Sequence, residues 1–450
     1  MSNHPPFDGA VARYAAHVNP QFVRVLHTIG FDRTWVGAEG ATLVDSTGER
    51  YLDLVGGFGM FNVGRNNPAV KAALIEALSD DLPHSVQLGV SSYAGALAEQ
   101  LLARLPDRLE RVLFTSSGTE AVEAALKYGR AATGRTRVIS ADHAFHGLTL
   151  GSLSANGCPE FRDGWGPLLE GFDRVPFGDL DALEAELRRE DVALFLIEPV
   201  QGKGVNLPPP GYLEGAQELC RRYGTLFCVD EVQTGFGRTG KLFALEHWGL
   251  EPDLVTMAKS LSGGYVPVGA CAMSRSVFER VNDSLEHAVR HGSTFAPNEL
   301  GMVAGLATLD ELDRASLVER TARLGERLLE LTKPLEDRYE VVKDVRGLGL
   351  MWAIEFGEPD SGSRSWRALE RRQAGIFSQF VVGPLFHRHR ILSQVAGHDL
   401  NVIKALPPLT IEEAEVERFA GALDDSIGRA TPVTWAAIRF AAGAGLRSIA

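Results

Sequence analysis

Thr225-Leu-Phe-Cys-Val-Asp230-Glu-Val-Gln-Thr-Gly235 is the stretch of this 450-residue chain that most directly predicts its fold. Five apolar or β-branched residues lead straight into two acids, a valine, an amide and a turn. An apolar run without polar alternation is typical of a strand buried on both faces of a sheet. Because burying a bare charge is expensive, acids at the end of such a strand must be paired or reachable by solvent. We therefore expect Asp230 to be functional rather than structural.

The same pattern recurs on both sides of this stretch. Further strands are predicted at residues 111–115, 137–140, 193–197, 253–257 and 269–273, and helices at 120–132, 180–189 and 212–223. Alternating strands and helices predict an α/β fold with a mostly parallel sheet and helices on both of its faces.

The pattern changes after about residue 300, where strands and helices predict a smaller α+β domain. One long helix is expected over residues 300–331, strands within 341–356, a polar loop over 357–366 and a closing helix over 411–427. The predicted organisation has four parts: an N-terminal segment (1–65) that contributes to the small domain and active site, a large domain (66–320), a small domain (321–430) and a C-terminal extension (431–450).

Composition excludes several classes of protein. The formal net charge of −13 argues against nucleic acid as a partner, and the average balance of 45% hydrophobic and 23% charged residues argues against wholesale disorder. Four scattered cysteines predict neither a disulfide framework nor a zinc site, so no metal is expected. Without a signal peptide or an apolar run of about 20 residues, we expect a soluble, cytoplasmic protein that does not enter membranes.

In open α/β sheets, ligands gather at the carboxyl ends of strands, so these ends carry the functional prediction. Ser116-Ser-Gly-Thr-Glu120 begins a helix and suits either a phosphate group or an ordinary helix cap. An aromatic residue, Phe145, and a glutamate, Glu198, follow two further strands; the alternatives are a core aromatic and a structural carboxylate. Lys259 comes directly after the apolar strand at 253–257, before a glycine-rich turn.

Lysine is scarce in this chain: only eight of the 45 basic residues are lysine, at positions 71, 127, 203, 241, 259, 333, 343 and 404. Lys259 alone sits where burial should lower its pKa, which a nucleophilic amine requires. A phosphate cradle, an aromatic ring, a carboxylate and a lysine together match pyridoxal phosphate, so we expect that cofactor.

With these motifs in order, the chain closely resembles the class III, or omega, aminotransferases of fold type I. The matching motifs, spread over residues 20–430, are Ser117-Gly-Thr-Glu-Ala-Val-Glu-Ala-Ala125, Phe145-His-Gly147, Glu198-Pro-Val-Gln-Gly202, Asp230-Glu-Val-Gln-Thr-Gly-Phe-Gly-Arg-Thr-Gly240, Lys259 and Gly292-Ser-Thr-Phe295. The resemblance implies a large domain with a mostly parallel seven-stranded sheet and a smaller C-terminal α+β domain. The stretches 17–20 and 56–64 look most like the putrescine (diamine) aminotransferase branch.

The resemblance also implies roles for individual residues. Lys259 would carry the cofactor as an internal aldimine and move the proton, while Asp230 would hold the pyridine nitrogen. Phe145 and Val232 would cover the two faces of the ring, and Gln233 would lie near its hydroxyl. The remaining residues of the implied cofactor site are Ser117, Gly118 and Thr119 at the phosphate, His146, Glu198, and Thr294 from the partner of a homodimer. Phe58 and Phe61 would line the substrate pocket.

Two positions depart from the family pattern and concern the substrate. Asn401-Val-Ile-Lys-Ala-Leu-Pro-Pro408 has Lys404 where many members have the arginine that grips an α-carboxylate. Lysine replaces a planar bidentate fork with a point charge, which weakens carboxylate recognition. Lys203 stands where many members have the glutamate that pairs with this arginine, although it could equally be a solvated loop residue.

We therefore expect a ping-pong aminotransferase that takes a primary amine without an α-carboxylate, such as a diamine or ω-amino compound, and an α-keto acid such as pyruvate. The alternative is a phospho-lyase, or an aminotransferase of a phosphate- or coenzyme A-bearing amine, that uses Lys203 and Lys404. A DNA-binding regulator and a nicotinamide dehydrogenase are disfavoured, because the chain shows neither a basic helix-turn-helix segment before residue 20 nor Gly-x-Gly-x-x-Gly after a strand. The amine donor, the acceptor and the role of the extension stay open.

Overall fold

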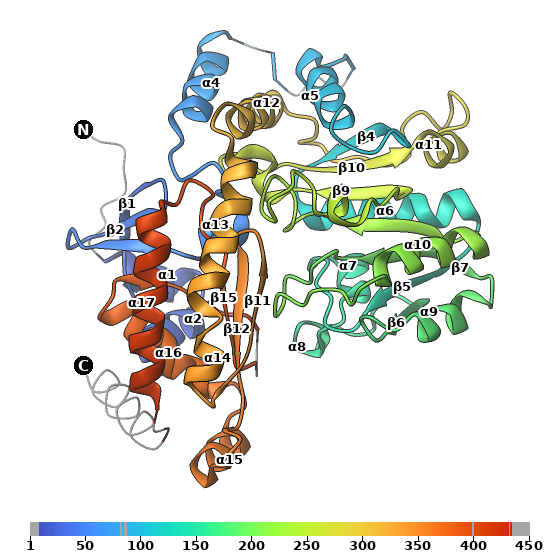
Figure 1. Ribbon diagram of the computed structural model, residues 1–450. Coiled ribbons are helices and arrows are strands. Elements are labelled where there is room, and N and C mark those ends of the chain that lie inside the picture. The colour runs from blue at the N-terminus through green and yellow to red at the C-terminus, as the bar shows by residue number, and fades with distance from the viewer. Residues whose placement is uncertain (1–8, 82, 85–87, 398–399, 432, 434–450) are drawn as a thin grey trace.

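The protein is described by a computed structural model that covers residues 9–431 and 433, except 82, 85–87 and 398–399. Figure 1 shows a large domain built around one sheet, and beside it a smaller body formed by the last part of the chain and the N-terminal segment. Trp435, Ile438, Phe440 and Leu446, at the apolar positions of the C-terminal extension whose role the sequence leaves open, lie outside the described residues. None of the described helices has the length and hydropathy needed to cross a membrane.

The large domain contains a mostly parallel seven-stranded sheet, as predicted. Across the sheet the strands are β4 (Leu109–Thr115), β10 (Gly269–Ser274), β9 (Leu254–Met257), β8 (Leu226–Asp230), β7 (Val192–Ile197), β5 (Arg137–Ala141) and β6 (Phe172–Val175). Only β10 runs antiparallel to its neighbours. The sequence prediction missed β6, because this edge strand exposes Asp173 and Arg174 and lacks an apolar run.

Helices cover both faces of this sheet, which explains why its central strands are apolar throughout. In β7, Leu194 and Leu196 pack into one buried cluster with α6 (Gly118–Thr133), whereas Phe195 and Ile197 pack into the opposite cluster with α10 (Tyr212–Tyr223). Since side chains alternate along a strand, a strand covered on both faces needs apolar residues at every position. The domain's other helices are α4 (Pro68–Ser79), α5 (Ser92–Leu102), α7 (Leu150–Ala155), α8 (Pro159–Arg162), α9 (Leu180–Leu187) and α11 (Arg275–Val281).

The single helix expected over residues 300–331 is wrong. The structure has two helices, α12 (Glu299–Arg314) and α13 (Leu317–Thr332), separated at Ser316. Ser316 has φ 47°, a left-handed conformation that an α-helix cannot continue through. No glycine or proline marks the break, so the sequence carried no signal of it.

The small domain combines two sheets with helices α13, α14 (Leu335–Arg338), α16 (Ile376–His387) and α17 (Glu413–Ala430). One sheet has the order β11 (Val342–Leu348), β12 (Met351–Phe356), β15 (Val402–Ala405) and β14 (Gln394–Val395). The other joins β1 (Trp35–Glu39), β2 (Thr42–Asp45) and β3 (Arg50–Asp53) of the N-terminal segment to β13 (Ile391–Leu392). The N-terminal segment is thereby attached to the small domain (Figure 1).

Helix α15 (Arg364–Arg372) corrects the end of the loop predicted over residues 357–366. The Ser363 hydroxyl caps this helix by accepting a hydrogen bond from the Trp366 N–H at 3.1 Å. Trp366 is 5% exposed and packs against Phe377, with ring centroids 4.7 Å apart. The polar residues around Trp366 favoured a loop, although this one buried aromatic side chain anchors α15.

Candidate active site between the two domains

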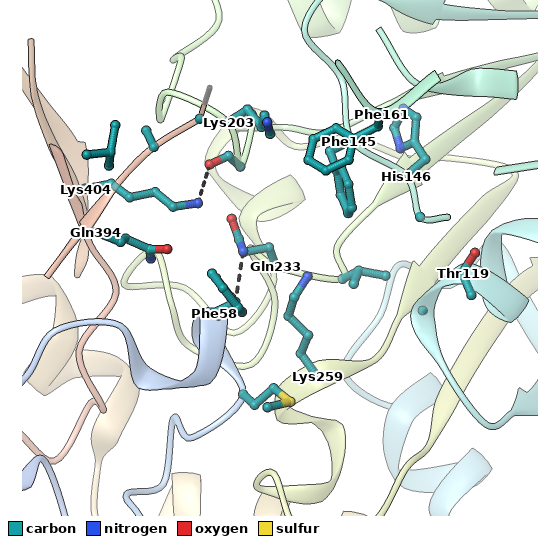
Figure 2. A pocket seen from close by; sticks show the side chains of 18 of the residues that line it. Phe58, Thr119, Phe145, His146, Phe161, Lys203, Gln233, Lys259, Gln394 and Lys404 are labelled. Atoms are coloured by element: carbon teal, nitrogen blue, oxygen red, sulfur yellow. Dashed lines mark hydrogen bonds between the residues drawn. The ribbon is translucent and has the colours of Figure 1, made fainter. Parts of the chain in front are cut away.

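A cavity of about 1360 Å³ opens at the carboxyl ends of β4, β5, β7, β8 and β9, where the sheet meets the small domain. It is lined by side chains from the sheet edge, from α2 (Pro20–Ile29), from the segment around Phe58 and from β14 and β15. Figure 2 shows Lys259 near its centre, with Thr119 and His146 on one side and Lys404 and Gln394 on the other. The strand ends that the sequence singled out therefore share one site.

Lys259 begins a short 3₁₀ turn, Lys259–Ser262, directly after β9 and Ala258. Its φ of 45° is left-handed, a strained conformation for a lysine that the surrounding structure must hold. The side chain projects into the cavity, and the protein around it lowers the pKa of the amine by desolvation, which Asp230 and Glu198 partly offset. A lowered pKa makes this amine available as a nucleophile and as a base.

Asp230 is the last residue of β8 and is 3% exposed. Its Oδ2 lies 2.8 Å from Nδ1 of His146, and its Oδ1 accepts hydrogen bonds from the Thr256 hydroxyl and the Val232 N–H, each at 3.0 Å. These partners hold the carboxylate in one orientation. A buried acid so positioned can accept a hydrogen bond from a ring nitrogen.

The start of α6 combines the two interpretations left open by the sequence. Ser117 is an N-cap whose Oγ accepts a hydrogen bond from the Glu120 N–H at 3.3 Å. The first N–H groups of any α-helix have no partner within the helix, and together with the helix dipole they favour an anion. The Thr119 hydroxyl lies beside the Ser152 and Thr149 hydroxyls, at 2.6 and 2.7 Å. The helix cap therefore leaves the start of α6 suited to an anion as well.

Glu198 connects two walls of the cavity. Its Oε2 accepts a hydrogen bond from the Phe145 N–H at 3.0 Å, and its Oε1 accepts one from the Gly202 N–H at 2.8 Å. Burial raises the pKa of this carboxyl, against the effect of His146 and the two N–H groups. Glu198 thus positions the aromatic side chain of Phe145, whose ring also contacts Phe161 at 5.1 Å between centroids.

Of the two aromatic residues predicted to line the substrate pocket, Phe58 lines this cavity. Its carbonyl accepts a hydrogen bond from Nε2 of Gln233 at 3.0 Å, and its ring is 58% exposed. Phe61 is not among the residues that line the cavity; the Arg65 guanidinium lies over its ring at 4.1 Å. Thr294 is exposed and also lies outside the cavity of its own chain.

The two unusual lysines both reach the cavity, but each is already engaged. Lys404 is 6% exposed, and its Nζ donates to the Gly202 carbonyl at 2.7 Å. Burial, and then the positive charge of Lys259, lowers the pKa of Lys404 to about 7. Nζ of Lys203 lies 2.6 Å from Oε1 of Glu160 and 4.1 Å from the centre of the Phe161 ring.

Several lining residues were missed from the sequence. Phe161 comes from the four-residue helix α8, which no motif marks, and Gln394 comes from the two-residue strand β14. The exposed face of α2 adds Gln21, Arg24 and Val25. Only the amphipathic spacing of α2 could have been read from the sequence, and that spacing does not say what the helix covers.

The residues present fit pyridoxal phosphate. Phe145 and Val232 line the cavity with Asp230, at the edge where α6 begins, so ring-covering groups, an acid and an anion site occur together. A Cβ at Gly118 would come within 2.8 Å of Val232, so only glycine leaves this approach to the helix open. Gln233 Oε1 is buried without a hydrogen-bond partner, and a ring hydroxyl would satisfy it. Among the described residues, no cluster of His, Cys, Asp or Glu is suited to a metal ion.

Comparisons with known proteins identify the family of this chain. The chain is 39% identical over 420 residues to a putrescine aminotransferase from Pectobacterium atrosepticum, covering 90% of this chain and 85% of the relative. It is 36% identical over 457 residues to the aminotransferase PigE from Serratia sp., covering 94% of this chain but only 54% of that longer relative.

The crystal structure of an amine transaminase from an uncultivated Pseudomonas species, in its pyridoxal-phosphate-bound form, superposes with a TM-score of 0.78 at 31% identity, covering 88% of this chain and 95% of that one. The family model for class-III aminotransferases matches residues 30–427. Pyridoxal phosphate is the cofactor that this family and site require. The chain belongs to the class III aminotransferases.

Proposed function

We propose that this enzyme moves an amino group from a primary amine without an α-carboxylate to an α-keto acid such as pyruvate, in two half-reactions of a ping-pong cycle. The observation that carries the proposal is the amine of Lys259, with its lowered pKa, in one cavity with the fixed carboxylate of Asp230. Lys404, at the position where many family members have an arginine that binds the substrate α-carboxylate, supports an amine donor without that group.

Each residue has a defined task in this proposal. Pyridoxal phosphate, when bound, supplies an aldehyde and an electron-accepting ring. Lys259 Nζ would hold the cofactor, and the same amine would take and return the substrate proton. Asp230, held by His146 and Thr256, would pair with the ring nitrogen. Phe145 and Val232 would cover the ring, and the start of α6 would hold the phosphate.

Lys404 supports an amine donor rather than an α-amino acid. Its single Nζ already donates to the Gly202 carbonyl at 2.7 Å, so it lacks both the planar fork and the freedom that tight carboxylate binding uses. Lys404 would also bind the carboxylate of a keto acid acceptor more weakly than an arginine at this position would.

The phospho-lyase alternative draws less support from the geometry. It requires Lys203 and Lys404 to meet a phosphate group, but Lys203 is paired with Glu160 at 2.6 Å. Binding a phosphate there would require breaking this ion pair.

We further propose a homodimer in which Thr294 reaches the phosphate site of the partner. Thr294 lies outside its own cavity, and apolar side chains are exposed near it in sequence: Leu285 (97%), Val289 (87%) and Phe295 (71%). Exposed apolar side chains of this number are typical of a surface that a second subunit covers.

The proposal is tested with purified enzyme, a panel of primary amines, and pyruvate or 2-oxoglutarate as acceptor. Formation of alanine or glutamate in step with loss of the amine supports transamination. Release of inorganic phosphate from a phosphorylated amino alcohol, without consumption of keto acid, would instead identify a phospho-lyase. A strong preference for 2-oxoglutarate would contradict the role given to Lys404.

A further inference from the structure

Gly202, in the wall of the cavity, is held by hydrogen bonds from both domains. Its N–H donates to Oε1 of Glu198 at 2.8 Å, and its carbonyl accepts a hydrogen bond from Nζ of Lys404 at 2.7 Å (Figure 2). Glu198 follows β7 of the large domain, whereas Lys404 lies on β15 of the small domain. Gly202 therefore connects the two domains beside the cofactor site.

Glu198 extends this connection to an aromatic wall of the cavity. Its other oxygen, Oε2, accepts a hydrogen bond from the Phe145 N–H at 3.0 Å. Because each carboxylate oxygen has its own N–H partner, the carboxylate cannot turn without losing one of the two bonds. A displacement of Gly202 would therefore reach the backbone of Phe145, and with it the ring that Phe145 places in the cavity.

The backbone at Gly202 lies in close contact with the cofactor site. A Cβ at this position would come within 2.4 Å of Oε1 of Gln233 and within 3.2 Å of Oε1 of Glu198. Glycine permits this approach, but it also gives the backbone its greatest conformational freedom. Contacts from outside the loop are needed to hold residue 202 in one place.

The small domain holds the same loop at a second point. Arg346 on β11 donates from Nη2 to the Gly204 carbonyl at 2.7 Å and from Nε to the Val205 carbonyl at 3.0 Å. Lys404 and Arg346 thus belong to one sheet, and both donate from charged groups to backbone carbonyls of residues 202–205. Hydrogen bonds from charged donors are stronger than those between neutral groups. This arrangement suits the fixing of a loop, because the acceptors belong to the protein itself.

We propose that Lys404 is a positioning residue: it fixes Gly202 and, through Glu198, holds Phe145 so that its ring stays over the cofactor. Lys404 would then affect both half-reactions, since the same cofactor ring takes part in each. The inference rests on the proposed function for the place of Phe145 over that ring. It gives the lysine a different task from the carboxylate-binding arginine that many family members have at this position.

The first test measures the order of the loop and needs no turnover. Hydrogen–deuterium exchange of the full chain, with and without bound cofactor, is followed in peptides that contain Gly202 or Phe145. Lys404→Met should exchange these N–H groups faster by about fivefold, whereas peptides from α10 should be unchanged. Methionine is close to lysine in length and removes a buried charge, so we expect the variant to fold. Lys404→Arg keeps a donor for the Gly202 carbonyl and should exchange like the wild type.

The second test separates positioning from substrate binding. Single-turnover absorbance follows the pyridoxal phosphate enzyme mixed with pentylamine or putrescine, and the aminated enzyme mixed with pyruvate. Lys404→Met should lower the limiting rate constants of both half-reactions by about tenfold, and should change the apparent Kd of pyruvate by less than about twofold.

A double variant tests whether Lys404 acts through Glu198. Glu198→Gln leaves one oxygen to accept from the two N–H groups of Gly202 and Phe145, so the connection is already weakened. In this background, Lys404→Met should lower the limiting rate constants by less than about threefold. The surface control is Lys333→Met, which removes a lysine that pairs with Glu336 at 2.7 Å and should leave exchange and rates unaffected.

The outcomes are distinct. A raised Kd for pyruvate with unchanged limiting rate constants would overturn the inference and identify Lys404 as a ligand of the acceptor carboxylate. Unchanged exchange at Gly202 and Phe145 in Lys404→Met would also overturn it. If the wild type transferred an amino group from no primary amine to any keto acid, the proposed function would fail, and the exchange measurement would still decide whether Lys404 fixes the loop.

Discussion

Replacing Lys404 with methionine should make the protein more stable near neutral pH. Lys404 is 6% exposed on β15, and burial with the nearby charge of Lys259 lowers its pKa from 10.5 to about 7. Methionine is close to lysine in length and carries no charge. If the buried amine is kept for its role in the active site, its removal should relieve a cost in folding free energy.

The size of this cost follows from the pKa difference. The folded state binds fewer protons than the unfolded state between pH 7 and pH 10.5, so wild-type stability rises with pH across this window. Each pH unit is worth about 1.4 kcal/mol, so the penalty is roughly 5 kcal/mol near pH 6.5 and roughly 2 kcal/mol near pH 9. The variant also loses the hydrogen bond to the Gly202 carbonyl, which reduces its gain in stability by about 1 kcal/mol.

The assay is thermal unfolding of wild type and Lys404→Met after removal of the cofactor, so that Lys259 carries its amine. We expect the variant to be more stable by about 4 kcal/mol near pH 6.5, and by about 1 kcal/mol near pH 9. Lys404→Arg is the control: it keeps a charge at this site and should show no such gain. A variant less stable than wild type at both pH values, or a difference independent of pH, would refute the reasoning.

Three further predictions concern the site and its support. Asp230→Asn keeps the hydrogen bonds to Thr256 and Val232 but removes the charge, so turnover should fall by roughly 100-fold while absorbance still shows bound cofactor. Gly118→Ala brings a Cβ within 2.8 Å of Val232, and titration of the cofactor-free protein should show affinity weakened by about tenfold; unchanged affinity would contradict the close approach. Arg238→Leu leaves the oxygens of Asn62, Pro407 and Leu350 without their donor, and should lower stability by about 3 kcal/mol in thermal unfolding; a melting temperature within a degree of wild type would count against this.

Local sequence patterns predicted the large domain well, because its central strands are continuous apolar runs. Helix α10 begins and ends where the pattern placed it, at Tyr212 and Tyr223, and the strand ends at Asp230 and Lys259 meet in one cavity as expected. A fully buried parallel strand needs a continuous apolar run, and a functional residue after such a run has few alternative explanations. The prediction of the cofactor site depended on these two rules.

What escaped prediction depends on the local path of the backbone and on contacts between distant segments. The break at Ser316 has no local signal, and the position of Phe61 against Arg65 follows from the local path of the N-terminal segment. The partner of Lys203 was unpredictable in the same way, because Glu160 lies 43 residues earlier on a helix of four residues. Side-chain pairing across loops is set by tertiary packing, which sequence periodicity does not encode.

Arg238 illustrates how such packing reaches the active site. This fully buried guanidinium follows the Asp230 stretch and donates to Asn62 Oδ1 at 2.5 Å and to the Pro407 carbonyl at 2.6 Å. Asn62 ends the segment that carries Phe58, and Pro407 lies three residues after Lys404. One side chain thus joins three segments that line the cavity.

The most direct test of the central claim is to locate the residue that carries the cofactor. Borohydride reduction of the holoenzyme, followed by peptide mass spectrometry, should place the pyridoxyl group on Lys259, and Lys259→Ala should lose both the label and turnover. Label on another lysine, or normal transamination by Lys259→Ala, would contradict the account.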